Sequence, residues 1–176
     1  MGAMSWFAQI LWDELFGWAQ HIVASLPDTP LGSRLRLAFY RSCLKSCGQF
    51  TSLSGLWIAS PQDVSIGDGV SFNRHVMIDA TDGEIRIGKN VLIGPYSVIR
   101  AADHVFADQA RPIREQGHVG GVISVEEDCW LGSHVVVTRN VTIGKGSVVG
   151  AHSVVTKDIP PYSLAMGVPA IVKGSR

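Results

Sequence analysis

Several residues that can carry charge or move protons share one stretch of the sequence, between residues 102 and 121. Asp103 and His104 open this stretch, and His118 lies near its end. Histidine is well suited to accept and return a proton near neutral pH, so His104 is a candidate general base. We do not expect Asp103 to pair with it, because neighbouring side chains on an extended chain point to opposite sides. A partner carboxylate would come from elsewhere in the fold.

The sequence on both sides of this stretch follows a repeat of six residues. Each repeat contains a large apolar residue, which is often followed by a small or acidic residue. The apolar residues are at positions 66, 72, 78, 87, 93, 99, 125, 131, 137, 143, 149 and 155. A period of six fits neither a helix nor an alternating strand, and it is typical of short strands joined by corners and stacked as coils. The prediction is a mainly β protein, a parallel β-helix with its apolar columns inside.

Two interruptions of the repeat predict loops. The spacing between positions 78 and 87 is nine, which places a turn at Thr81-Asp82-Gly83. The spacing between positions 99 and 125 is 26, so residues 102–121 leave the stack and return to it. Long loops on a rigid scaffold often carry function, which supports His104 as a candidate.

The N-terminal part of the chain has a helical pattern instead. Apolar residues recur at helical spacing from Phe7 to Leu26, where Ser5 can cap the start and Pro27 ends the helix. A second helix is expected over residues 31–47, and its charged residues are all basic: Arg34, Arg36, Arg41 and Lys45.

Two interpretations of these helices stay open. They can cap the first coil and hide its hydrogen-bonding edge. Alternatively, residues 5–47 can make a peripheral contact with an anionic membrane surface. The two roles are compatible with each other.

Composition narrows the function classes. The 176 residues carry a formal net charge of zero and no nucleic-acid-reading motif, so no nucleic-acid partner is expected. The sequence has three cysteines and no recognisable signal peptide, which favours a reducing, cytoplasmic location. A peripheral contact through residues 5–47 would then be with the inner face of the membrane. No set of His and Cys residues completes a metal site, and no metal requirement is expected.

The expected division of the chain has three parts. Residues 1–4, Met-Gly-Ala-Met, have the character of an expression remnant. Residues 5–50 form the helical N-terminal segment. Residues 51–176 form the β-helix domain, with the loop at 102–121 and a C-terminal tail.

Ordered blocks within the repeat carry a family resemblance. The sequence resembles the hexapeptide-repeat acyltransferases, in particular the sugar O-acetyltransferases of the galactoside, maltose and nodulation type. The resemblance runs from Val64 to Val172 through Ser71-Phe72-Asn73, Ile87-Gly88-Lys89-Asn90-Val91-Leu92-Ile93-Gly94-Pro95, Trp130-Leu131-Gly132-Ser133-His134-Val135-Val136, Val154-Val155-Thr156-Lys157-Asp158-Ile159-Pro160-Pro161 and Gly167-Val168-Pro169-Ala170. It implies a left-handed coil, a homotrimer with active sites between subunits, and acetyl-coenzyme A as the donor.

The same resemblance implies roles for individual residues. His104 matches the place of the family's catalytic histidine, in agreement with the loop argument. Asn73 and Asp79 match residues that contact the acceptor sugar. The positions that bind the acetyl-coenzyme A donor carry over to Ser133, Ala151, Thr156 and Lys157. The remaining histidines, at positions 21, 75, 118, 134 and 152, are expected at surface or interface positions, with His75 and His118 as secondary candidates for substrate contact.

The predicted function is therefore acetyl-coenzyme A dependent O-acetylation of a sugar, in surface polysaccharide or lipid-linked glycan synthesis. Transfer would be direct, because no Cys or Ser has a recognisable nucleophile setting. Two alternatives remain: N-acetylation of an amino sugar or antibiotic, and a β-helix that binds or assembles without catalysis.

Overall fold

The structure, a computed structural model, describes residues 6–176. The suggested remnant at residues 1–4 and the expected helix cap at Ser5 lie outside the described residues. So do the side chains of residues 6–10, 12 and 13, which include part of the apolar pattern predicted for the first helix.

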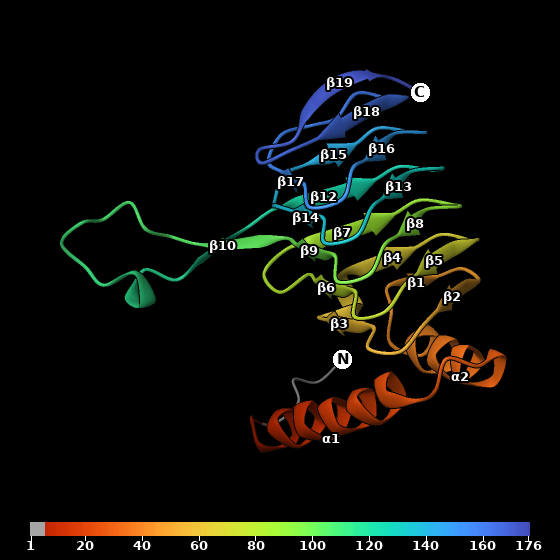
Figure 1. The fold of residues 1–176 in the computed structure, drawn as a ribbon. Coiled ribbons are helices and arrows are strands. Elements are labelled where there is room, and N and C mark those ends of the chain that lie inside the picture. The colour runs from red at the N-terminus through yellow and green to blue at the C-terminus, as the bar shows by residue number, and fades with distance from the viewer. Residues whose placement is uncertain (1–5) are drawn as a thin grey trace.

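Most of the chain winds into a stack of coils with three flat faces, seen from the side in Figure 1. The first face contains β1 (Ser46–Cys47), β4 (Val64–Ile66), β7 (Glu84–Ile87), β12 (Val122–Val125) and β15 (Thr142–Ile143). The second contains β2 (Phe50–Ser52), β5 (Val70–Phe72), β8 (Leu92–Ile93), β13 (Trp130–Leu131), β16 (Val148–Val149), β18 (Ser163–Met166) and β19 (Ile171–Ser175). The third contains β3 (Trp57–Ala59), β6 (Met77–Asp79), β9 (Val98–Arg100), β14 (Val136–Val137) and β17 (Val154–Val155). Neighbouring strands are parallel except β18 and β19, where the C-terminal tail folds back.

The register of the strands confirms the repeat of six. Along the first face, Ile66 pairs with Ile87, Ile87 with Val125, and Val125 with Ile143. The other two faces show the same alignment. Every predicted repeat position is at most 3 % exposed, so each column of apolar side chains lies inside the coil.

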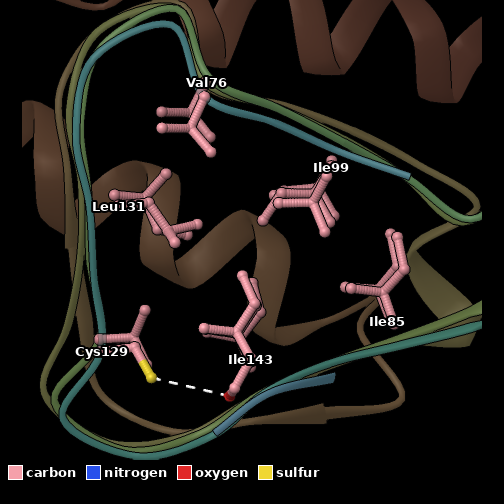
Figure 2. Close-up of a cluster of buried hydrophobic side chains, with 14 of the residues drawn as sticks. Val76, Ile85, Ile99, Cys129, Leu131 and Ile143 are labelled. Atoms are coloured by element: carbon pink, nitrogen blue, oxygen red, sulfur yellow. Dashed lines mark hydrogen bonds between the residues drawn. The ribbon is translucent and has the colours of Figure 1, made fainter. Parts of the chain in front are cut away.

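Figure 2 shows how the three faces fill this interior. Ile143, Leu131 and Ile99 come from the first, second and third face respectively, and all three are fully buried. Cys129 lies at the edge of the cluster, where its thiol contacts the carbonyl oxygen of Ile143 at 3.8 Å. The interior is therefore a continuous packed core.

The corner between the second and third faces, the second corner, needs small residues. A Cβ atom added at Gly94 would come within 2.5 Å of the backbone of Gly132 in the next coil. Glycine is required here because successive coils approach too closely for a side chain.

The N-terminal helices α1 (Trp6–Ser25) and α2 (Pro30–Arg41) lie across the open end of the first coil (Figure 1). The buried Arg36 guanidinium donates to the carbonyl oxygens of Ser52 and Leu26, both at 2.8 Å. The Tyr40 hydroxyl donates to the carbonyl oxygen of Leu56 at 3.0 Å. The helices thus supply hydrogen-bond partners to backbone groups of the first coil and of their own connection.

The second helix ends earlier than its sequence pattern predicts. It stops at Arg41, and Ser46 and Cys47 form β1 in register with Ser65 and Ile66. The expected helix over 31–47 is wrong in its last turns, because Cys47 occupies the first-coil position of the apolar column. The β-helix accordingly begins near Ser46, before the expected boundary at residue 51.

The long loop leaves the stack after the third face, as expected from the break in the repeat. Its base is an antiparallel hairpin of β10 (Ala102–His104) and β11 (His118–Gly120). The rest of the loop includes a short 3-10 helix at Ile113–Glu115 and adds no strand to the stack. A second 3-10 helix, Pro61–Asp63, connects β3 to β4. Figure 1 shows the loop extending away from the coils.

Candidate active site

The predicted site residues all lie on the third face or on its two edges. The second corner forms one edge, and the other is the third corner, where the chain passes from the third face to the first. Asn73, Ser133 and Ala151 are at the second corner; Asp79 ends a third-face strand; His104, Thr156 and Lys157 follow third-face strands. The fold therefore brings residues separated by more than eighty positions to one side of the molecule.

Ser133 and Ala151 occupy equivalent places in successive coils. The Ser133 carbonyl oxygen accepts a hydrogen bond from the His152 amide at 2.9 Å, next to Ala151. Ala151 is exposed and Ser133 is half-buried. Their small side chains leave this edge open over two coils.

Thr156 and Lys157 lie at the opposite edge, directly after β17. Both side chains are exposed. The residues one coil below are Thr138 and Arg139, and the Arg139 guanidinium is ion-paired with Asp103. At this edge Lys157 is therefore the cation suited to a phosphate group.

The outward surface of the third face between these edges is apolar. Trp57, Met77, Val98, Val136 and Val154 pair in register from coil to coil and are all half-buried. Alternation along each strand places these side chains outside, because their neighbours fill the core. We call these five residues the third-face stripe.

His104 lies at the base of the long loop with its side chain exposed. It is the register partner of His118 in the hairpin, and the two ring centroids are 4.2 Å apart with the rings tilted by 42°. Nδ1 of His118 is 3.5 Å from a carboxylate oxygen of Asp82, which lies in the turn of the preceding coil. The candidate base therefore belongs to a row of three titratable groups, in the order His104, His118 and Asp82.

Asp103 points away from this row, as expected for the residue next to His104. Its carboxylate accepts from Nε of Arg139 at 2.7 Å. This pair ties the start of the loop to the third corner of the following coil.

Asp79 is buried and already has partners, whereas a residue that binds the acceptor directly would be open to solvent. Asp79 is only 4 % exposed, and its carboxylate pairs with Arg100 and accepts from the Thr81 amide at 3.0 Å. Nε of Arg100 donates to the carbonyl oxygen of Ala102 at 3.1 Å. Asp79 thus holds the guanidinium that supports the first residue of the hairpin, and its part in acceptor binding stays a prediction.

Asn73 is exposed and lines a cavity of about 750 Å³ between α2 and the first two coils. The walls include Phe50 and Leu37 on the apolar side and Arg34 and Ser71 on the polar side. Such a mixed lining is suited to a partly polar ligand.

Four aromatic and histidine rings stack along the second corner, a feature that was not predicted from the sequence. His75, Tyr96, His134 and His152 form one column, with successive centroids 5.0, 5.0 and 4.7 Å apart. All four have positive φ angles of 56–59°. The signal was in the register, because each of these residues stands at the same place in its own coil.

The cysteines are free and do not form a reactive centre. Burial raises the pKa of Cys43 to about 11, and burial also raises the pKa of Cys47 and of Cys129. The thiol form is therefore favoured at neutral pH, which disfavours a thiolate nucleophile. Within the part of the chain that the structure describes, no group of three or more His, Cys, Asp or Glu side chains could hold a metal ion.

This fold and this arrangement define a hexapeptide-repeat β-helix protein. The family model described as bacterial transferase hexapeptide (six repeats) matches residues 123–157. A hexapeptide-repeat containing acetyltransferase from Vibrio cholerae superposes with a TM-score of 0.82 at 30 % identity, over 92 % of this chain and 89 % of that one. The chain belongs to the hexapeptide-repeat acetyltransferases, which confirms the left-handed parallel β-helix expected from the resemblance.

Two further matches are informative about ligands. A second structure of the same Vibrio cholerae protein, complexed with acetyl coenzyme A, gives a TM-score of 0.81 at 29 % identity, over 99 % of this chain and 92 % of that one. The galactoside O-acetyltransferase of Escherichia coli is 36 % identical over 122 residues, which are 66 % of this chain and 59 % of that protein. The chain spans between 36 and 59 % of the length of the first curated relatives it matches. None of the described helices is both long enough and apolar enough to cross a bilayer.

Proposed function

We propose that this protein transfers an acetyl group from acetyl-coenzyme A to a hydroxyl group of a sugar, with His104 as the general base. The observation that carries the proposal is the shared position of His104 and the predicted donor residues along the third face. The similarity to the acetyl coenzyme A complex and to the galactoside O-acetyltransferase supports the donor and the acceptor class.

The reaction follows from the properties of these residues. His104 takes the proton from the acceptor hydroxyl, and the hydroxyl oxygen attacks the carbonyl carbon of the thioester. The carbon–sulfur bond breaks as the new ester is completed, and His104 returns the proton to the departing sulfur. A backbone amide of a neighbouring coil would stabilise the oxyanion. The raised pKa values of the cysteine thiols are consistent with direct transfer.

The donor fits the surface between the two edges. Ser133 and Ala151 leave room for a thin chain at the second corner, and the third-face stripe offers it an apolar wall. Lys157 and Thr156 would meet the phosphate groups at the third corner. Asn73 would contact the sugar, and Asp79 would act through Arg100.

We further propose that the active protein is a homotrimer whose sites lie between subunits. The third-face stripe is apolar on its outer side, and Leu92 and Trp130 on the second face are 50 % and 53 % exposed. Covering such residues is a common reason for association. His104 of one subunit would then approach Asn73 of its neighbour.

The acceptor would be a sugar of a surface polysaccharide or a lipid-linked glycan. The exposed face of α1 supports a peripheral membrane contact, because Leu15, Trp18 and Ile22 are 59–68 % exposed along one side of the helix. Exposed Arg34 and Arg41 on α2 would attract anionic lipid headgroups.

The decisive experiment is an acceptor screen with acetyl-coenzyme A, in which free thiol is measured and the products are analysed by mass spectrometry. His104→Ala should lower kcat by about 100-fold to 10,000-fold, the usual contribution of a general base. His21→Ala, a histidine on α1, is the matched control and should retain activity. Near wild-type turnover by His104→Ala would refute this assignment of the base.

The same screen separates the alternatives. Acetylation of amino sugars in preference to hydroxyl-only sugars would indicate an N-acetyltransferase. Failure to bind acetyl-coenzyme A in calorimetry would indicate a β-helix used only for binding or assembly.

A further inference from the structure

The turn at residues 81–83 and the long loop are the two insertions in the repeat, and they meet at the third corner. A Cβ atom added at Gly120 would lie 1.5 Å from the carbonyl oxygen of Asp82, so the loop base passes directly against the turn. One added at Gly83 would lie 2.6 Å from the carbonyl oxygen of Gly121. The small insertion therefore forms the support on which β11 is placed.

This contact fixes a definite order of charged groups. Asp82 is near Nδ1 of His118, at 3.5 Å, and the His118 ring lies against the His104 ring at a centroid separation of 4.2 Å. At this corner Asp103 is paired with Arg139 and Asp79 with Arg100, while Lys157 is exposed one coil beyond Arg139. Asp82 is thus the carboxylate that faces the histidine pair, and it faces the member that is not the proposed base.

Two imidazole rings this close do not both carry a positive charge easily, since like charges at about 4 Å repel even in water. A carboxylate beside one imidazole ring stabilises the positive charge on that ring rather than on the other. We propose that Asp82 holds the positive charge on His118 and that this charge keeps His104 unprotonated and able to act as a base. His118 and Asp82 are positioning residues for the reaction, and this inference rests on the proposed function of His104.

The sign of the effect distinguishes this arrangement from a simpler one. If Asp82 acts through His118, removing Asp82 lets the proton move to His104. As the pH is lowered, the variant then loses activity at a higher pH than the wild type does. If Asp82 instead attracts a proton directly to His104, its removal shifts that loss to a lower pH. A purely structural role for the turn would change the overall rate without moving the pH profile.

The kinetic test compares kcat/KM from pH 5 to pH 9 for the wild-type protein and three variants. Asp82→Asn and His118→Phe should each raise the pH of half-maximal activity by about 0.5 unit, from a repulsion of roughly one charge pair in water. Asn tolerates the positive φ of 62° at position 82, and Phe keeps the ring contact without a charge. Glu115→Gln, an exposed loop carboxylate that lies outside this row, is the control and should leave the profile unchanged.

The double variant tests the order of the row. In a His118→Phe background, Asp82→Asn should produce no further shift, because the charge through which it acts is gone. A downward shift in Asp82→Asn, or an equal shift with and without His118, overturns the proposal.

A second measurement does not depend on turnover. NMR titration of the histidine ring signals, assigned with His104→Ala and His118→Phe, should show His118 taking up its proton at a higher pH than His104. The reverse order overturns the inference even in an active enzyme. Absence of acetyl transfer at every pH, with the expected order of protonation, would count against the proposed function alone.

Discussion

Replacing Arg36 by methionine should detach the N-terminal helices from the first coil. The guanidinium is fully buried and donates to two backbone carbonyl groups, those of Leu26 and Ser52, and to the Ser52 hydroxyl at 3.1 Å. Methionine fills a similar space but has no donor, so the buried Ser52 carbonyl oxygen and the partly buried Leu26 carbonyl oxygen would both lose this partner.

The magnitude follows from these contacts. An orphaned buried acceptor costs about 1–3 kcal/mol; the Ser52 carbonyl oxygen incurs this cost in full and the partly buried Leu26 carbonyl oxygen in part. Part of this cost is offset because the guanidinium no longer has to be desolvated. Asp28, 3.9 Å from Arg36, is not orphaned, because it keeps its 2.6 Å ion pair with Arg74. The expected loss is therefore about 2–4 kcal/mol.

Stacked coils can open from one end, so this loss should appear first as local opening. Hydrogen exchange is the suitable assay, with the Gly55 amide as reporter because it bonds the Ala24 carbonyl oxygen across the junction at 2.8 Å. Its exchange should accelerate about 30-fold to 1000-fold, as expected for 2–4 kcal/mol. Arg34→Met, on the exposed side of α2, is the matched control. Equal exchange in Arg36→Met and Arg34→Met would refute the reasoning.

Two further predictions concern the donor edge and the first face. Lys157→Met should raise KM for acetyl-coenzyme A about tenfold with kcat nearly unchanged, since a charged hydrogen bond to phosphate contributes about 1.5–3 kcal/mol. Lys89→Met, at an exposed corner away from the third face, is the control. Equal KM values for the two variants would show that Lys157 does not bind the donor. Hydrogen bonds from Arg86 and then Lys45 lower the pKa of Glu84 from 4.5 to about 2. Its folded pKa is below the unfolded value, so its contribution to stability is present above pH 4.5 and is lost as the pH falls toward 2. Urea unfolding of wild type and Glu84→Gln should differ at pH 6 and converge at pH 2; a difference independent of pH would contradict this cause.

The stack of coils could be predicted from the sequence because its interior repeats. Each buried position is filled by the same kind of residue one coil later, as Ile93 and Leu131 show by pairing in register. The first coil could not be found in this way. Its corresponding positions include Ser52 and Cys47, which pair with Phe72 and Ile66. Ser52 is tolerated inside because Arg36 bonds both its hydroxyl and its carbonyl group.

The site was less accessible to sequence reasoning, and the reason is physical. His104 was found because it follows a break in the repeat. His118 and Asp82 gave no separate signal, since one was a histidine in a loop and the other a turn residue. Their relation depends on the hairpin register and on the turn of the preceding coil, which a local pattern does not specify.

The offset between coils does contain part of this information. Asp79 pairs with Arg100, so residues of these two coils align at a separation of 21 along the third face. Continuing that alignment past the strands brings Asp82 opposite Asp103 and next to His104. In a β-helix, insertions at the same corner of adjacent coils must therefore meet, however unlike they are in length. The same argument predicts that lengthening the turn, for example by one glycine after Asp82, should displace His118 from His104. Its effect on the pH profile should then match that of His118→Phe, and an unchanged profile would show that the turn does not position the histidine pair.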